Sequence, residues 1–204
     1  GSFDAKVDWL YVDTNLNQFR DYGRKGGFTE TALAYGEPLF IPDDANNNGV
    51  LDPNERILRL GRSKITKIRE NSIDYTRGQN LIDFPSTSME ESQHGTAVIG
   101  IIAGGQNPGR RSLVGLAPMA EIILWSFAQD TEESLVDAID WGMENGSRVN
   151  LYEWSVWMGY HLDGSSNLEV AMDAAASAGI AQISPAGNLA NANKHASAII
   201  SAGA

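Results

Sequence analysis

The chain has 204 residues and no cysteine, which excludes disulfides, thiolate metal sites and cysteine nucleophiles. Its formal net charge of −11 argues against a general nucleic-acid-binding protein, because a phosphate backbone requires clustered positive charge. Hydrophobic residues make up 42% of the chain, and no apolar run approaches the roughly 18 residues of a membrane span, so we expect one substantial domain without a membrane partner.

Short apolar runs alternate with longer helical segments, which predicts an α/β fold with a doubly wound, mostly parallel sheet and helices on both faces. The expected strands are residues 7–12, 122–127, 149–152, 180–184 and 198–201. The expected helices are residues 94–104, a helix opened by Asp130 and stopped at Asn145-Gly146, and residues 167–178 before Gly179. In such a sheet, the carboxyl ends of the strands lie along one edge.

Residues 15–92 interrupt this alternation. The segment is polar and rich in Asn, Asp, Gly and Arg, so we predict an enlarged insertion of irregular structure with a hairpin around residues 57–68. Basic residues gather between Arg56 and Arg77, where a solvated face is favoured over a site for polyanions.

A twelve-residue calcium loop is predicted at residues 44–55, inside this insertion. The expected ligands are the side chains of Asp44, Asn46, Asn48, Asp52 and Glu55 and the main-chain carbonyl of Val50. Gly49 stands where the loop turns sharply, and a hard cation prefers such a set of oxygens. The alternative is an Asn/Gly/Asp turn that binds nothing. Pro42 and Pro53 disfavour long flanking helices, so Ca²⁺ is expected to brace the insertion rather than take part in chemistry.

Three motifs place polar side chains at the same expected sheet edge. Asp13 ends the first strand in Asp13-Thr14-Asn15, His94 begins a helix in His94-Gly95-Thr96, and Asn188 follows a later strand in Ala186-Gly187-Asn188. Taken singly, a strand-end aspartate usually caps a loop, a lone histidine usually packs, and an asparagine after glycine usually turns. Together and in this order they are candidates for one site.

The three motifs resemble those of the subtilisin-like serine protease (subtilase) family, and Gly115-Leu-Ala-Pro118 resembles the family's turn before a strand. The resemblance covers nearly all of residues 1–204 and implies the N-terminal part of a subtilisin-like catalytic domain. It implies that Asp13 orients His94, that His94 is the general base, and that Asn188 donates to the oxyanion.

The same resemblance implies that Ser155 and Gly159 line the cleft for a polypeptide substrate. The family's Gly-Thr-Ser-Met-Ala segment, which supplies the nucleophile, does not follow Asn188, and Thr87-Ser88-Met89 lacks the preceding glycine. A complementary C-terminal fragment is therefore expected to carry the catalytic serine.

Two functions from different classes remain open. The first is a serine endopeptidase with an Asp-His-Ser triad, and the second is a noncatalytic, calcium-braced binding module or pseudoprotease with a subtilisin-like fold. The acidic, cysteine-free composition is compatible with a secreted or extracytoplasmic protein.

Overall fold

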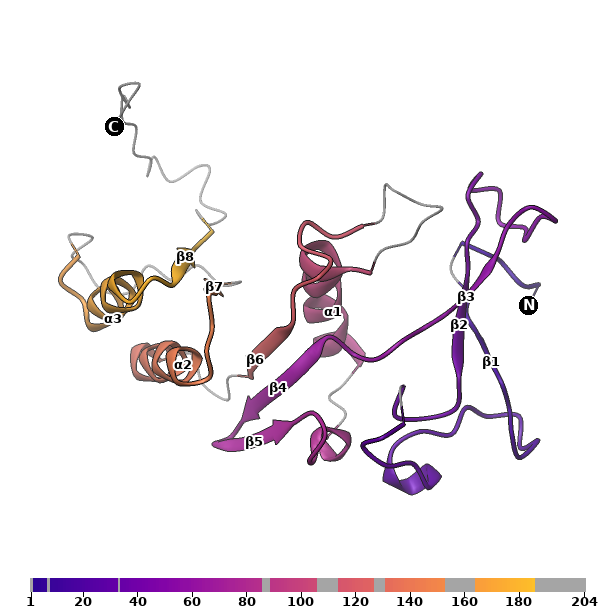
Figure 1. Cartoon of the computed structure of the whole chain (residues 1–204), viewed down its shortest axis with the longest axis horizontal. Coiled ribbons are helices and arrows are strands. Elements are labelled where there is room, and N and C mark those ends of the chain that lie inside the picture. The colour runs from indigo at the N-terminus through magenta and orange to yellow at the C-terminus, as the bar shows by residue number, and fades with distance from the viewer. Residues whose placement is uncertain are drawn as a thin grey trace. The chain divides into compact units, whose positions relative to one another are not determined.

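The computed structural model describes residues 2–6, 8–32, 34–85, 89–105, 114–126, 131–152 and 164–185. The chain divides into two compact units, Gly1–Ala128 and Gln129–Ala204, whose elements are labelled in Figure 1. Of the helices in the described ranges, none combines the length and the apolar character needed to cross a bilayer.

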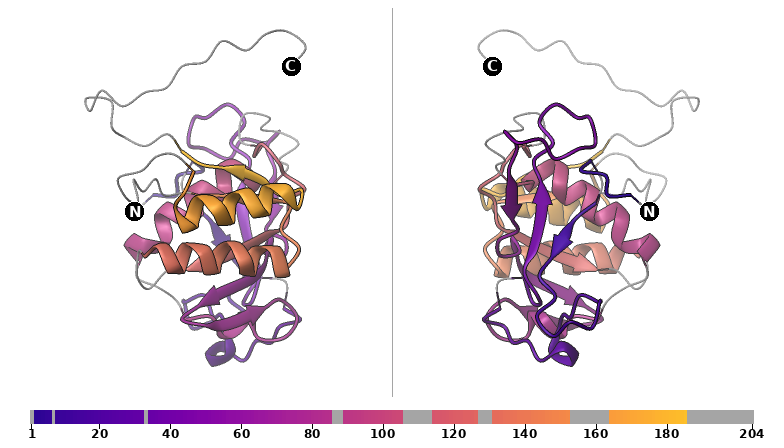
Figure 2. Two further views of the ribbon diagram at one scale, coloured as in Figure 1. Left: turned by 90° about the vertical axis from the view of Figure 1, so that its left-hand side faces the viewer. Right: turned by 90° about the vertical axis from the view of Figure 1, so that its right-hand side faces the viewer.

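The first unit contains two small sheets and a helix. The antiparallel sheet has the order β1-β2-β3, formed by Leu10–Tyr11, Leu39–Pro42 and Ile57–Arg59 (Figure 2). The second sheet has the order β5-β4-β6, formed by Ile73–Thr76, Ile65–Glu70 and Ile122–Ser126, with β4 and β6 parallel. The 3₁₀ turns Arg24–Gly26 (η1) and Leu81–Asp83 (η2) and the helix Met89–Ala103 (α1) complete the described elements of this unit.

Local turn chemistry explains how these strands pair. Asn71 and Ser72 have positive φ angles of 49° and 64°, which a two-residue turn between the antiparallel strands β4 and β5 requires. The loop of residues 44–55 joins β2 to β3, and the Asp43 N–H closes it by donating to the Arg56 carbonyl at 2.8 Å. The predicted hairpin over residues 57–68 is therefore wrong, because β3 pairs back with β2 and β4 pairs with β5 and β6.

The first expected strand is also placed differently from its prediction. Within this segment, residues 8–12 are described and form only β1, which pairs antiparallel with β2 at Leu10 and Phe40 and does not join the sheet of β6. Conversely, β4 lies in the segment expected to be irregular and pairs in parallel with β6 through Ile65 and Ile122. The expected strand at residues 122–127 is confirmed as β6. The α/β class holds, but a single doubly wound sheet is not confirmed by the described residues.

The second unit is a β-α-β arrangement with an additional helix. Its elements are α2 (Glu132–Glu144), β7 (Val149–Leu151), α3 (Asn167–Ser177) and β8 (Ala181–Ile183). Strands β7 and β8 are parallel, and α2 and α3 pack side by side (Figure 2). The buried centre consists of Ile139, Ala175 and Ile180, surrounded by the partly buried Met143, Tyr152, Leu168, Ala171 and Met172. The two helices and the strands at residues 149–152 and 180–184 are confirmed.

Caps account for the accuracy of these helix bounds. The Thr131 hydroxyl accepts the Ser134 N–H at 3.2 Å at the start of α2, and Gly146, with φ of 76°, follows its end. At the start of α3, Ser166 and Glu169 form a reciprocal capping box. Gly179, with φ of 87°, follows the end of α3.

Removing the capping box should destabilise the second unit. We expect Ser166→Ala to lower the free energy of unfolding by about 1 kcal/mol, because the Glu169 N–H loses its side-chain acceptor. The measurement is thermal unfolding followed by circular dichroism, where the midpoint should fall by roughly 2–4 °C. Ser177→Ala, at the other end of α3, is the matched control and should cause no loss. Equal midpoints for the two variants would contradict a stabilising role of the cap.

Candidate functional site

His94 lies in the second turn of α1 and is exposed to solvent. The helix begins at Met89, so the prediction that it begins at His94 is wrong. No proline or glycine separates Met89 from His94, so the sequence holds no helix-breaking residue between them. The helix therefore extends five residues further toward the N-terminus than the motif indicated.

The segment that follows α1 in the structure packs against the last turn of this helix. Leu116 donates its main-chain N–H to the Ile101 carbonyl at 3.0 Å, and the next N–H, that of Ala117, donates to the next carbonyl at 2.7 Å. A Cβ added to Gly115 would lie 2.4 Å from the nitrogen of Gly104, so only glycine permits this approach. The Gly-Leu-Ala-Pro motif thus satisfies carbonyls that the helix end leaves without an intrahelical partner.

Lys64 connects the second sheet of the first unit to the last turn of α1. It precedes β4, and its ammonium donates to the carbonyl of Ala103 at 2.5 Å and to the carbonyl of Pro118. A cation near the last carbonyls of a helix is favoured by the helix dipole. The position of the helix that carries His94 therefore depends on a residue from within the 15–92 segment.

Asp13 lies in a loop directly after β1. Its two carboxylate oxygens accept the main-chain N–H groups of Asn17 at 3.2 Å and Gln18 at 2.7 Å. The sequence predicts that Asp13 ends a strand of a parallel sheet. That prediction is wrong, because β1 is antiparallel to β2. The structure thus places Asp13 at the antiparallel sheet and His94 on α1, and Asp13's assignment as the orienting aspartate stays a prediction.

Glu37 lies beside the Asp13 loop and is only 1% exposed. Its Oε1 accepts both the N–H and the hydroxyl of Thr14 at 2.6 Å, and its Oε2 accepts the Asp21 N–H at 3.0 Å. The hydrogen bonds from Thr14, then that from Asp21, hold the pKa of Glu37 below its ordinary value. Glu37 is therefore a carboxylate at neutral pH, and sequence reasoning missed it because it stands outside any motif.

The predicted calcium loop has a closed, inward-facing arrangement. Asp44, which is fully buried, accepts the N–H groups of Asn48 at 2.9 Å and Gly49 at 2.8 Å. Asp52 accepts the side-chain amides of Asn46 at 2.7 Å and Asn48 at 2.9 Å. Four of the six expected ligands are thus joined by direct hydrogen bonds.

Glu55 closes this loop from its other end. Its Oε1 accepts the Ala45 N–H at 2.6 Å and its Oε2 accepts the Asp52 N–H at 3.0 Å. In the described ranges, no three or more His, Asp or Glu side chains gather into a metal-binding group. Half of the expected donors, however, are asparagine amides and a carbonyl, which are ordinary calcium ligands, so the donor set fits this cation.

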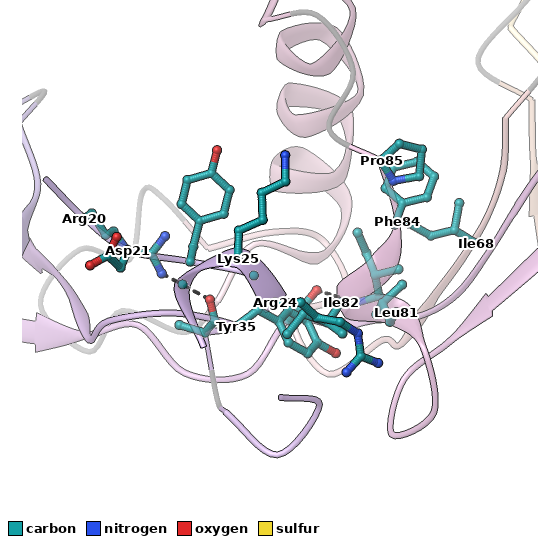
Figure 3. Close-up of a pocket in the computed structure, with 16 residues that line it drawn as sticks. Arg20, Asp21, Arg24, Lys25, Tyr35, Ile68, Leu81, Ile82, Phe84 and Pro85 are labelled. Atoms are coloured by element: carbon teal, nitrogen blue, oxygen red, sulfur yellow. Dashed lines mark hydrogen bonds between the residues drawn. The ribbon is translucent and has the colours of Figure 1, made fainter. Parts of the chain in front are cut away.

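A pocket of about 810 Å³ opens elsewhere in the first unit (Figure 3). Its wall combines the cationic side chains of Arg20, Arg24 and Lys25 with apolar ones such as Leu81 and Phe84. The histidine of α1 is not among the described residues that line it. This pocket is therefore separate from the candidate catalytic histidine.

Three predicted site residues cannot be placed against this geometry. Asn188, Ser155 and Gly159 lie outside the described residues, as does the expected strand at residues 198–201. Of the predicted catalytic set, the structure describes Asp13 and His94, and of the predicted calcium ligands it describes all six.

Comparison with known proteins identifies the family. Searches of curated proteins and of solved structures give no match. The sequence model of the Subtilase family of serine peptidases matches residues 13–203, which is nearly the whole chain and includes the His94 motif, the Gly115 turn and the Asn188 motif. The chain belongs to the subtilase family.

Proposed function

We propose that the protein is a serine endopeptidase in which His94 is the general base. The observation that carries the proposal is the family match over residues 13–203, with the His-Gly-Thr motif on α1. In this chemistry the histidine takes the proton of a serine hydroxyl as the serine attacks the peptide carbonyl, and returns it to the leaving amine. Exposure of His94 is compatible with access for a polypeptide substrate.

The remaining catalytic groups are assigned by motif. We propose that Asn188 donates its amide N–H to the oxyanion, an interaction that contributes roughly 3–4 kcal/mol in such sites. We also propose that Ser155 and Gly159 contact the substrate. Because no Gly-Thr-Ser-x-Ala segment occurs in these 204 residues, the nucleophilic serine is proposed to come from a complementary segment of polypeptide. The proposal rests on His94 and the family, and does not depend on Asp13, whose oxygens are engaged within its own loop.

We further propose that residues 44–55 bind Ca²⁺. Support comes from the ligand order of the sequence and from the inward-facing carboxylates of Asp44, Asp52 and Glu55. The loop joins β2 to β3, so the cation would fix the end of this hairpin. Family membership supports action outside the cytoplasm.

The test is labelling with a serine-directed fluorophosphonate, followed by denaturing intact-mass spectrometry. For a peptidase, we expect the label on a polypeptide that carries the serine segment and copurifies with this chain or continues it. Prior denaturation should abolish the labelling, which controls for nonspecific reaction. Assembled material that never takes the label would instead favour the noncatalytic binding module.

A further inference from the structure

We propose that the chain has a second calcium-binding loop, formed by residues 13–21 and closed by Glu37. The oxygen donors are the side chains of Asp13, Asn15, Asn17, Asp21 and Glu37 and the main-chain carbonyl of Phe19. This inference goes beyond the proposed function, because binding of a cation there does not require peptidase activity.

The order of residues in this loop is the ligand order of residues 44–55. Aspartate, asparagine, asparagine and aspartate stand at positions 1, 3, 5 and 9 of both loops. Position 6, where calcium loops turn sharply, has a positive φ in both: 69° at Gln18 and 83° at Gly49. Among the positions that supply side-chain ligands, only position 12 differs, because Arg24 stands where the other loop has Glu55.

The side chains make the same hydrogen bonds in both loops. The aspartate at position 1 accepts the N–H groups of positions 5 and 6, at 3.2 and 2.7 Å for Asp13 and at 2.9 and 2.8 Å for Asp44. The aspartate at position 9, Asp21 or Asp52, accepts the side-chain amides of both asparagines. The side-chain oxygens at positions 1 and 9 therefore have the same hydrogen-bond partners in both loops.

Glu37 supplies the carboxylate that position 12 lacks. One of its oxygens accepts the N–H of position 2 at 2.6 Å and the other accepts the N–H of position 9 at 3.0 Å. Glu55 makes the same two bonds, also at 2.6 and 3.0 Å. Arg24, which stands at position 12 of the sequence pattern, forms an ion pair with Asp83 and takes no part in closing the loop. A carboxylate from 16 residues beyond Asp21 thus completes the ligand set.

The charges of this cluster are an independent observation that points to a cation. Asp13, Asp21 and Glu37 form no ion pair with a lysine or arginine in the described part of the chain. The hydrogen bonds that Glu37 accepts and, to a smaller extent, the Arg20 charge lower the pKa of Glu37, but the guanidinium donates its hydrogen bonds to the main-chain carbonyls of Ala34 and Glu37, at 3.1 and 3.2 Å, and not to a carboxylate. Neutral N–H donors satisfy hydrogen bonding but supply no net charge, and a nearly buried carboxylate such as that of Glu37 is normally paired or metal-bound. A divalent cation would supply that charge.

The inference gives Asp13 a role other than orienting His94. A carboxylate that binds a cation and accepts two N–H groups keeps at most one of its roughly four lone pairs for an imidazole, so we expect another aspartate to orient the histidine. The two roles separate in Asp13→Asn. Loss of the triad aspartate lowers kcat by about 10⁴-fold with calcium stoichiometry unchanged, whereas loss of a ligand lowers the stoichiometry.

The experiment is isothermal titration calorimetry of the full chain with Ca²⁺, using the equivalent variants Asp21→Asn and Asp52→Asn. Asparagine can still accept the two side-chain amides while it removes the charge. We expect two bound equivalents for the unmodified chain and one for each variant. Glu144→Gln, an exposed carboxylate on α2, is the control and should keep both.

One equivalent that Asp52→Asn removes and Asp21→Asn leaves unchanged would overturn the inference, as would no binding at all. One equivalent that only Asp21→Asn removes would support it and contradict the site at residues 44–55. None of these results bears on fluorophosphonate labelling, so failure of the proposed function is seen separately. If a variant fails to fold, Mn²⁺ added to the unmodified chain decides: broadening of the Gln18 and Gly49 amide signals supports two sites, and broadening of Gly49 alone contradicts the second.

Discussion

Replacing His94 with alanine in the assembled peptidase should lower kcat by about 10⁶-fold, because removal of the general base of a triad costs nearly as much as removal of the whole triad. KM should change little, since the imidazole contributes to the transition state and not to uniform binding of the peptide. Initial rates on a peptide substrate with a fluorescent leaving group measure both constants.

His161→Gln provides the matched control, because His161 belongs to none of the motifs and should leave kcat within a factor of about two. Equal unfolding midpoints for the two variants would show that the loss is chemical. A His94→Ala enzyme that keeps more than about a hundredth of kcat would exclude His94 as the base, since general-base catalysis alone contributes roughly 10²–10⁴-fold.

Replacing Glu55 with glutamine should remove the stabilisation that we expect from the proposed calcium site at residues 44–55. A ligand present at about 1,000 times its dissociation constant stabilises the folded state by roughly 4 kcal/mol, which corresponds to a rise of roughly 10 °C in the unfolding midpoint of a chain of this size. Glutamine keeps an acceptor for the Ala45 N–H but loses the bidentate carboxylate, so the contribution of residues 44–55 to this rise should disappear while that of residues 13–21 remains.

The measurement is the unfolding midpoint with excess Ca²⁺ and with a chelator, for Glu55→Gln and for Glu144→Gln. The Glu144 variant should show the unmodified rise, because this exposed side chain at the end of α2 is not a ligand. Once calcium is removed, the Glu55 variant should unfold roughly 2–4 °C below the unmodified chain, because glutamine has no second acceptor for the Asp52 N–H. An identical calcium-induced rise in both variants would show that residues 44–55 are a turn without a cation.

The second unit was the most predictable part of the fold. Its helices are capped at their starts by Thr131 and Ser166 and end before Gly146 and Gly179, and these caps act over a few residues of sequence. Strands β7 and β8 flank α3 closely, so a β-α-β unit needs no information from distant parts of the chain. Local signals were sufficient there.

The first unit was less predictable because its pairings are not local. Leu10 pairs with Phe40, and Ile65 pairs with Ile122, and no short-range pattern specifies such partners. The second loop shows the same limit. Its Asp-x-Asn-x-Asn pattern is visible after β1, but Gln18 replaces the glycine and the closing carboxylate of Glu37 comes from another segment. Only the folded chain brings that carboxylate to the loop.

The contacts of Lys64 limit how far this protein can be shortened. Long surface segments between secondary-structure elements are usually tolerant of deletion, and residues 15–92 would be the obvious stretch to trim in engineering a smaller enzyme. Lys64 holds the carbonyls of Ala103 and Pro118, and β4 directly after it is the parallel neighbour of β6. A minimal version of the protein would therefore have to retain residues 64–76. A deletion that crosses Lys64 would remove contacts that hold the end of α1 in place.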